Sequence, residues 1–385
     1  MGGKNVFCAA FGLIALAFTG CRPHDFPQYP ANYREYAYVT NGVSGTVSVL
    51  DVVNMRLDRE IAVGQNPVAV TASPTRKEVY VVNSGSGSVS VIDATRNAVA
   101  ATIPVHKQPV SIHLDSDGKF AYVANAGSNT VSVVDLTTRR LVATIGVGEE
   151  PRVARVSRDD KTLVVANRKG HSVSVIDAKS LRVRAIFEGC PGANDVVILP
   201  DSSKALVACA DGHQVMAIAL ASEAQPDKPA RQDKLEALLD VGRAPEHLTL
   251  KPDGGETFVL NSLSNSVSEI YNTTDEVGST YLIGAAPKDG VVTKDNSLLY
   301  VANANSQYVT VYSIDDGKRI GSVHVGDGPS AMAFSETGHL LFVVDAGSGD
   351  VAAIRTATRP LPSLFTLLPA GRGPNAIAVK SFRVQ

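Results

Sequence analysis

The sequence predicts an all-β protein, a β-propeller of eight four-stranded blades closed by the C-terminal strand, with seven blades as the alternative. Three observations predict this fold: a short strand motif that returns about every 42 residues, four strand-like segments in each unit, and a last segment with no partner in its own unit. A fixed period of this length is typical of repeat folds. Four short antiparallel strands per unit are typical of a propeller blade.

Eight short motifs mark the units, most of them a Tyr-Val or similar pair followed two positions later by Asn. They begin at Tyr38, Tyr80, Tyr122, Val164, Val207, Phe258, Tyr300 and Phe342. The fifth unit departs from the pattern, because it has Val-Ala-Cys-Ala in place of the motif and is longer than the others. Its extra residues fall in 221–234, a polar stretch with two prolines, which predicts an exposed loop between the third and fourth strands of that blade. This irregular unit is the reason for the seven-blade alternative.

Each unit repeats the same order of segments. In residues 80–121, a β-branched strand is followed by a Gly-containing turn, a strand that alternates Ser with Val, a third strand, and a fourth strand after Pro109. Small Ser and Val side chains on both faces allow each sheet to pack between two neighbours. A β-sandwich would instead show one apolar and one polar face.

The two ends of the repeat region complement each other. The first motif, at residues 38–41, has no strand of the fourth kind before it, and residues 374–379 have no motif after them. We therefore expect the C-terminal strand to complete the first blade beside residues 38–50, closing the ring without a covalent bond.

The first residues have the features of a bacterial export signal. Lys4 is followed by an uncharged apolar run from Val6 to Phe18, too short for a typical membrane-spanning helix, and then by small residues before Cys21. We expect a lipoprotein signal peptide at 1–20, lipidation of Cys21, a tether at 21–36 and the propeller at 37–385. The alternative is an ordinary signal peptide that contains a cysteine. The lipid would anchor the protein to a membrane, with the propeller periplasmic or on the cell surface.

The charges give no basic excess. Lys and Arg number 36 and Asp and Glu number 38, so bulk charge does not favour nucleic acid as a partner. We expect a monomer, with the membrane and a protein or small molecule as partners.

The recurrent Tyr-Val-x-Asn motif, followed by Ser-Val-Ser-Val-Ile-Asp and Gly-x-x-Pro, resembles the YVTN-type β-propeller family, also described as surface-layer or PQQ-associated propellers. The resemblance covers residues 38–385 and concerns the fold. Members look like binding modules, cell-surface proteins or parts of periplasmic redox systems, so the resemblance implies no single role.

The loops before the innermost strands carry the Gly-x-x-Pro pattern and should surround one mouth of the central channel. The residues that open these strands vary from blade to blade while the framework repeats, as a selective pocket requires. The alternative is a solvated funnel in which the charged residues only pair. The candidate rim residues are Arg152, Asp195, Glu246, His247, Lys288 and Asn375.

Two further groups of residues are candidates for binding or cross-linking. His171 and His213 fall in equivalent hairpin loops of blades 4 and 5, and with Asp211 they could bind a metal ion or an axial haem position. The alternative is that, with eight histidines in the sequence, two of them fall on the same face by chance. Cys190 and Cys209 remain after export and could form a disulfide between antiparallel neighbours, or stay as separate buried thiols.

The absence of a nucleophile–base arrangement favours a binding or scaffold module that is not an enzyme. One alternative is a propeller lactonase, with Glu246, His247 and Arg152 as acid–base residues at the funnel. Another is a redox-associated propeller similar to the haem d1 domains of nitrite reductases. We predict no cofactor, and the sequence lacks the Cys-x-x-Cys-His motif of covalent haem attachment.

Overall fold

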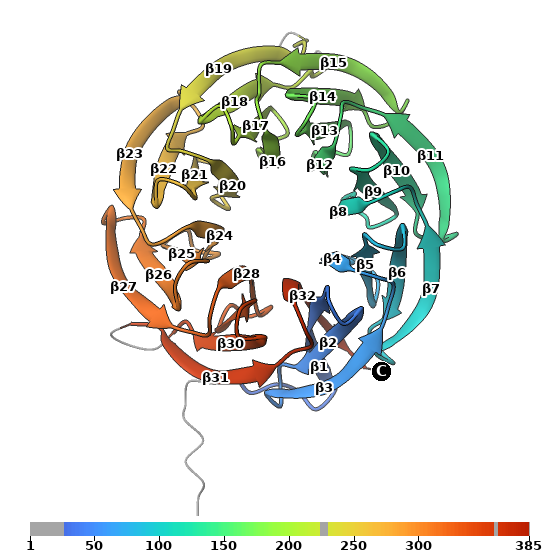
Figure 1. Cartoon of the computed structure of the whole chain (residues 1–385), viewed down its shortest axis with the longest axis vertical. Helices are drawn as coiled ribbons and strands as arrows, with labels where there is room; N and C mark the ends of the chain where they lie inside the picture. The colour runs from blue at the N-terminus through green and yellow to red at the C-terminus, as the bar shows by residue number, and fades with distance from the viewer. Residues whose placement is uncertain (1–26, 224–229, 358–360, 385) are drawn as a thin grey trace, which may run out of the picture.

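The computed structural model describes residues 27–223, 230–357 and 361–384. Eight four-stranded antiparallel sheets stand around a central channel like the blades of a propeller (Figure 1). The prediction of eight blades is confirmed, and the seven-blade alternative is wrong, because the irregular fifth unit forms a complete sheet. The predicted signal peptide and Cys21 lie outside the described residues, and no helix among the described residues is long and apolar enough to span a membrane.

Strands are named in chain order, and blades are numbered from the one that contains the first strand. From innermost to outermost, the strands are β32 (Pro374–Arg383), β1 (Tyr33–Asn41), β2 (Thr46–Asp51) and β3 (Arg56–Ala62) in blade 1; β4 (Pro67–Ala72), β5 (Glu78–Asn83), β6 (Ser88–Asp93) and β7 (Ala98–Pro104) in blade 2; β8 (Pro109–Leu114), β9 (Phe120–Asn125), β10 (Thr130–Asp135) and β11 (Arg140–Gly146) in blade 3; and β12 (Pro151–Val156), β13 (Thr162–Asn167), β14 (Ser172–Asp177) and β15 (Arg182–Glu188) in blade 4. The other half comprises β16 (Ala193–Ile198), β17 (Lys204–Cys209), β18 (Gln214–Ala219) and β19 (Lys234–Asp240) in blade 5; β20 (Pro245–Leu250), β21 (Glu256–Asn261), β22 (Ser266–Tyr271) and β23 (Glu276–Leu282) in blade 6; β24 (Pro287–Val292), β25 (Leu298–Asn303), β26 (Tyr308–Ser313) and β27 (Lys318–His324) in blade 7; and β28 (Pro329–Phe334), β29 (Leu340–Asp345), β30 (Asp350–Arg355) and β31 (Ser363–Pro369) in blade 8.

The hydrophobic core lies between blades rather than inside them. The two middle strands of each blade are buried on both faces, whereas the outermost strands are mostly exposed or half-buried. One apolar cluster joins Val164 and Val173 of blade 4 to Val207 and Met216 of blade 5. Each sheet therefore hides its faces against two neighbours, as the Ser/Val alternation predicts.

Pairing of the first and last strands closes the ring. β1 and β32 are antiparallel from Tyr33↔Arg383 to Asn41↔Pro374, and β32 takes the innermost position of blade 1. Closure by the C-terminal strand is thus confirmed. Residues 33–36, assigned from the sequence to the tether, are part of β1, because their backbone pairs with the end of β32.

The recurrent Asn is explained by a contact with the Gly of the Gly-x-x-Pro loop. In blade 2, Asn83 Nδ2 donates to Ser90 Oγ at 2.9 Å, and Asn83 Oδ1 accepts a hydrogen bond from the Gly64 backbone N at 3.1 Å. A Cβ on Gly64 would lie 2.6 Å from Asn83, so this close approach requires glycine. Gly371 and Asn41 are in the same close approach in blade 1, so the non-covalent closure reproduces the geometry of a continuous chain.

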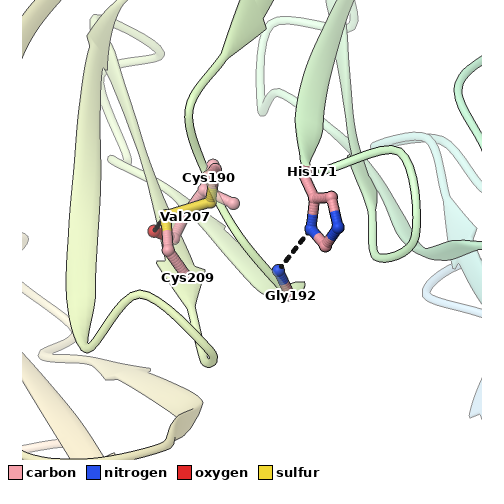
Figure 2. The surroundings of a disulfide bond; sticks show 5 residues. All are labelled: His171, Cys190, Gly192, Val207 and Cys209. Carbon is pink, nitrogen blue, oxygen red and sulfur yellow. Dashed lines mark hydrogen bonds between the residues drawn. A yellow bond between two sulfur atoms is a disulfide. The ribbon is translucent and has the colours of Figure 1, made fainter.

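In blade 5 a disulfide takes the place of this contact. Cys209 stands opposite Ala193 in the register where Asn83 stands opposite Pro67, and Cys190 precedes Ala193 by the same interval as Gly64 precedes Pro67. The sulfurs of Cys190 and Cys209 are bonded at 2.05 Å, with the Cα atoms 4.8 Å apart (Figure 2). Blade 5 therefore has a covalent bond where most other blades have the close approach of Gly and Asn or Asp.

The polar insertion lies where the sequence predicts it. β18 ends at Ala219 and β19 begins at Lys234, so the insertion connects the third and fourth strands of blade 5. Its described part contains a bridge between Ser222 and Arg231.

Candidate functional site

The innermost strands present a variable residue at the funnel face, which is the face of the Gly-x-x-Pro loops. In most blades the register with the second strand shifts just after the Pro position, as between Pro151 and Val153, and the bulge leaves the intervening residue unpaired. A bulge re-aims its side chain away from the ladder. The residues at this rim position are Val68, Val110, Arg152, Asn194, Glu246, Lys288, Ser330 and Asn375.

Asp195 is the exception among the residues that the sequence places at this position. Ala193 pairs with Cys209, and Asp195 pairs with Ala208 on the regular ladder, so the rim position of blade 5 belongs to Asn194. The loop of blade 5 has Ala193 where the others have Pro, which moves the alignment by one residue. Asp195 is instead equivalent to His247 and Asp289 on the next two blades.

A chain of polar contacts links the rims of four consecutive blades. Arg168 Nη1 of blade 4 donates to Asn194 Oδ1 at 2.6 Å, and Asn194 Nδ2 donates to the Glu246 carbonyl oxygen at 2.7 Å. The Glu246 carboxylate then pairs with Lys288 Nζ of blade 7 at 2.8 Å. Glu246 and Lys288 therefore pair, as the alternative of a solvated funnel expects.

Asn375, the rim residue of blade 1, fastens its blade to blade 2. Its Oδ1 accepts a hydrogen bond from Thr40 Oγ1 at 2.6 Å, and its Nδ2 donates to the Pro67 carbonyl oxygen at 2.9 Å. Both ends of the amide are in use, which gives this residue a role in holding the ring.

Arg152 differs from the other charged rim residues. Its side chain is exposed at the funnel and forms no hydrogen bond or ion pair with a described residue. Partial burial lowers the pKa of Arg152, and the neighbouring Arg168 guanidinium lowers it further. Two cationic groups therefore lie close together, and the donors of one are unused.

Deeper in the channel, a histidine lies between two carboxylates from neighbouring blades. His247 Nδ1 is 3.0 Å from Asp195 Oδ2, and His247 Nε2 is 3.2 Å from Asp289 Oδ1. The His247 side chain keeps 31% of its surface exposed, whereas Asp195 keeps 8%. The three residues form a continuous line of close charged contacts across blades 5, 6 and 7.

The two carboxylates also bind the free backbone edges of the innermost strands. Asp195 Oδ2 accepts a hydrogen bond from the Leu248 N at 3.0 Å, and Asp289 Oδ2 accepts one from the Met332 N at 2.6 Å. Each accepting oxygen reaches the next blade. An innermost strand has no neighbour on its channel side, so its N–H groups need such acceptors.

Burial and neighbouring charges have opposing effects on the pKa values of these three residues. Burial alone would lower the pKa of His247, but the Asp195 and Asp289 carboxylates outweigh it and raise the pKa above 6.5. Burial favours the neutral form of Asp195, but the charge and hydrogen bond of His247, with Arg155, lower its pKa to about 2. Burial dominates at Asp289 and raises its pKa. The Asp195 and Asp289 carboxylates therefore favour the protonated form of His247, and His247 in turn favours the ionised form of Asp195.

Blades 3 and 4 add polar groups whose hydrogen-bonding capacity is unused. Arg155 Nη2 lies 3.8 Å from Asp195 Oδ1, and its buried Nε has no partner in the described part of the chain. Ser111 Oγ and His113 Nδ1 on β8 are also buried and unpartnered. Burial, with the charge of Arg155, lowers the pKa of His113 to about 3, so this imidazole is neutral.

His171 and His213 lie in equivalent hairpins, as the sequence predicts, and each makes a structural contact. His171 Nδ1 accepts a hydrogen bond from the Gly192 N at 3.2 Å (Figure 2), and His213 Nδ1 accepts one from the Ala244 N at 3.4 Å. In the equivalent hairpin of blade 3, Asn129 Oδ1 likewise accepts a hydrogen bond from the Glu150 N, in the loop before β12. Across the described ranges, no group of three or more His, Cys, Asp or Glu side chains could hold a metal ion. The metal site of His171, His213 and Asp211 gains no support.

The sequence alone did not single out Asn194, Asp289, Arg155, Arg168 or His113. A signal was available for three of them, since polar residues interrupt the small and apolar residues of the innermost strands at Asp289, Arg155 and His113. What the repeat pattern does not show is that these side chains reach across to the next blade.

The chain is an eight-bladed β-propeller related to two families of propellers. Residues 76–247 match the cytochrome D1 heme domain family, and residues 195–363 match the family of lactonases with a 7-bladed β-propeller. The second family is described with one blade fewer than this ring contains. No curated protein matches the sequence.

Solved structures with the same fold share little sequence with this chain. Dihydro-heme d1 dehydrogenase NirN in complex with DHE has a TM-score of 0.68 and 15% identity, over 94% of this chain and 78% of that chain. AztD from Citrobacter koseri has a TM-score of 0.66 and 12% identity, over 92% and 99%. Hydrazine synthase from Kuenenia stuttgartiensis has a TM-score of 0.57 and 23% identity, over 83% and 92%. These likenesses concern the fold.

Proposed function

We propose that this protein is a lipid-anchored, extracytoplasmic binding module that takes a small carboxylate or phosphate anion at the funnel face. The observation that carries the proposal is Arg152, an exposed guanidinium at the rim without a partner among the described residues, beside a second guanidinium. A planar guanidinium binds carboxylate and phosphate oxygens with two parallel hydrogen bonds.

The deeper channel supports the same ligand class. Arg155 lies on the same strand as Arg152, three positions further along, and its buried Nε lacks an acceptor. The negative charges near Arg152 are engaged, because Glu150 pairs with Lys169 and Glu246 pairs with Lys288. Deeper in the channel, Asp195 pairs with His247. Arg152 and Arg155 therefore have hydrogen-bond donors that are not used, and the nearby carboxylates are already paired. This combination favours the binding of an anion at blade 4.

Calorimetric titration of the purified, anchored protein with citrate and with inorganic phosphate tests the proposal. We expect saturable binding of at least one of them, and a loss of about tenfold or more in affinity for R152A, the size expected for hydrogen bonds to a charged group. The control is R140A, which removes an exposed guanidinium from outermost strand β11. Equal affinities of R152A and R140A, or no binding by the natural protein, would contradict the proposal.

The anchor needs its own measurement. Cys21 follows an apolar run that ends in small residues, which supports a diacylglyceryl modification and an amino-terminal acyl chain at that residue. Mass spectrometry of the protein expressed with its own leader should show an acylated Cys21, and C21S should be released from membranes. An unmodified Cys21 would refute the anchor and leave the anion site to stand on its own test.

A lactonase is the second candidate, and the Asp195–His247–Asp289 line favours it. All three residues lie within the segment that matches the lactonase family. A histidine whose pKa is raised by neighbouring carboxylates can act as a general acid. Hydrolysis of a sugar lactone by the natural protein, abolished in H247A, would support this activity, whereas the same rate in both proteins would dismiss it.

Haem d1 does not fit the funnel histidines. Both ring nitrogens of His247 face carboxylates, and the Nδ1 atoms of His171 and His213 accept backbone hydrogen bonds. The proposed function therefore includes no haem. Visible absorbance from the natively purified protein would overturn this conclusion.

A further inference from the structure

One position at the funnel face carries a small residue in every blade except blade 4. It is the first residue after the strand with the recurrent Asn, and its backbone N donates to the loop before the innermost strand, as the Ser84 N does to the Asn66 carbonyl oxygen at 2.9 Å. In blade 4 the residue is Arg168, whose N makes the same bond to the Glu150 carbonyl oxygen at 3.0 Å. The residues of the other blades are Gly42, Ser84, Ala126, Ala210, Ser262, Ala304 and Ala346. The backbone therefore does not require an arginine here, and the long side chain needs another explanation.

Blade 4 also has an arginine at the rim position. Arg152 is the bulged residue between Pro151 and Val153, and Pro151 pairs with Asn167, the residue before Arg168. Arg152 and Arg168 therefore project from the same end of the β12–β13 pair. Blade 7 has the other cationic rim residue, Lys288, but a small residue at the second position. Two cationic side chains at this pair of positions occur in blade 4 alone.

Asn194 of blade 5 holds the Arg168 side chain in place. Arg168 Nη1 donates to Asn194 Oδ1 at 2.6 Å, and Asn194 Nδ2 is itself fixed by the Glu246 carbonyl oxygen at 2.7 Å. This contact uses one N–H group of the guanidinium, and the side chain makes no ion pair with a described residue. Arg168 is half-buried and Arg152 is exposed, so both guanidinium groups have surface that a ligand can reach.

The two guanidinium groups lie close enough for their charges to interact, since the Arg168 charge lowers the pKa of Arg152. The carboxylates near them have other partners: Glu150 pairs with Lys169 at 2.6 Å, and Glu246 pairs with Lys288 at 2.8 Å. Like charges brought together without a shared counter-ion repel each other, and a bound anion removes that repulsion. Each guanidinium also offers parallel N–H groups to a pair of oxygens.

We propose that Arg168 is a second ligand-binding residue of the anion site, and that the ligand is a dianion, a phosphate monoester or a short dicarboxylate, held between Arg152 and Arg168. The inference rests on the anion site proposed above and narrows its ligand class. Asn194 is a positioning residue in this site, because it acts on the ligand through Arg168.

Two matched pairs of probes test the charge of the ligand. Methyl phosphate and dimethyl phosphate differ by one negative charge, as do malonate and acetate. Calorimetry on the whole protein at about pH 8, where a phosphate monoester is fully ionised, should show that at least one dianion binds about tenfold or more tightly than its monoanionic partner. The pair that shows this preference identifies the ligand as a phosphate monoester or a dicarboxylate.

R168A tests the residue. Alanine stands at this position in four other blades, so the variant should fold as the natural protein does. It should bind the preferred dianion about tenfold more weakly and the monoanion almost unchanged, whereas R152A should weaken both. R243A is the control, because it removes an exposed guanidinium at the same face of blade 6, where Arg243 Nη2 donates to the Leu263 carbonyl oxygen. It should keep the natural preference.

N194A tests the positioning role. It keeps both arginines and should lower the ratio of dianion to monoanion affinity, a quantity that a loss of stability alone does not change. An unchanged ratio would overturn the role of Asn194.

The inference about Arg168 is wrong if both monoanions bind as tightly as their dianionic partners, or if R168A keeps the natural preference. In those cases a loss of affinity for every probe in R152A would leave the anion site itself in place. If none of the four probes binds, the anion site fails and this inference fails with it.

Discussion

Asp345 stands directly opposite Asp350 across the β29–β30 pair, at the place where most other blades have Asn opposite Ser or Thr. Asp345 has an exposed fraction of 0%, one of its oxygens accepts a hydrogen bond from the Gly326 N at 2.9 Å, and the other has no partner within the described ranges. Burial and the nearby Asp350 carboxylate raise the pKa of Asp345 to about 8. Asp345 of blade 8 therefore keeps its proton up to about pH 8, whereas the Asn at this position in most other blades carries no titratable group.

The first prediction concerns the replacement of Asp345 by Asn, which removes the titrating carboxyl group. The folded-state pKa of Asp345 is above its ordinary value of 3.8, so the folded protein binds more protons than the unfolded chain between those values. Its stability should fall as pH rises from about 4 to about 8. D345N restores the usual Asn and should raise the free energy of unfolding by about 2 kcal/mol or more at pH 9, and by less at pH 5.

Urea denaturation at the two pH values measures this effect. N83D, which places a carboxyl group in a regular blade, should do the opposite and destabilise more at pH 9 than at pH 5. A gain from D345N that does not depend on pH would show that the two carboxyl groups share no proton.

The second prediction concerns the close approach of Gly and Asn. A Cβ added to Gly284 would lie 2.3 Å from Asn303 Oδ1, whereas a Cβ on Gly146 would meet nothing within 4 Å. G284A should therefore lower the free energy of unfolding by about 1–3 kcal/mol, the usual cost of overpacking. G146A should change it little. Chemical denaturation of both variants decides, and equal effects would remove the steric explanation of the repeated glycine.

The third prediction concerns the disulfide. Cys190 and Cys209 are 19 residues apart, and closing a loop of this size stabilises by about 3 kcal/mol through the unfolded chain. C190A/C209A should lose stability of that order in denaturant. A reducing agent should lower the melting temperature of the natural protein and leave that of the double variant unchanged. Natural protein that melts identically with and without reductant would contradict a formed bond.

The fourth prediction concerns His247. Its folded-state pKa lies above the ordinary 6.5, so its ion pair with Asp195 contributes fully below about pH 6.5 and is lost as pH rises through the folded-state pKa. H247Q should cost about 1–3 kcal/mol at pH 6 and less at pH 9. The groups facing the ring are Asp195, Asp289 and Arg155.

H324Q is the control for His247, because His324 is exposed and its Nε2 lies 3.2 Å from the Gln307 side chain, with no carboxylate paired to it among the described residues. H247Q and the natural protein both contain Asp345, so the pH dependence that Asp345 produces cancels in the difference between their free energies of unfolding. What remains is the pH dependence due to His247. A difference that grows with pH would reverse the assignment of charge.

The fold was predictable because each unit contains four strand segments, of which the first three belong to one blade and the fourth is the innermost strand of the next. Tyr80 to Asn83, the Gly-containing turn and the Ser/Val strand determine local pairing, and the unmatched residues 374–379 determine closure. The extent of β1 was missed by a few residues, because Tyr33–Tyr36 lie before the first repeat motif and their pairing with the end of β32 is visible only in three dimensions.

The site was predictable only at the positions that the repeat itself marks. Arg152, Glu246 and Lys288 follow Pro and were found, whereas the missing Pro of blade 5 displaced the assignment from Asn194 to Asp195. Contacts such as His247 with Asp289 join different blades, so they depend on how the sheets rotate against each other. No pattern within one unit encodes that relationship.

The register of the closing ladder determines how the ring responds to mechanical load. Tyr33 and Arg383 are paired, so the chain enters and leaves the β1–β32 ladder at the same end. Tension between these two points would peel the ladder one hydrogen-bonded pair at a time, the geometry of a zipper pulled from its open end, rather than shear all pairs together. Blade 5, which contains the Cys190–Cys209 disulfide, lies across the ring from blade 1 (Figure 1), so peeling that begins at the closing ladder would reach the disulfide last.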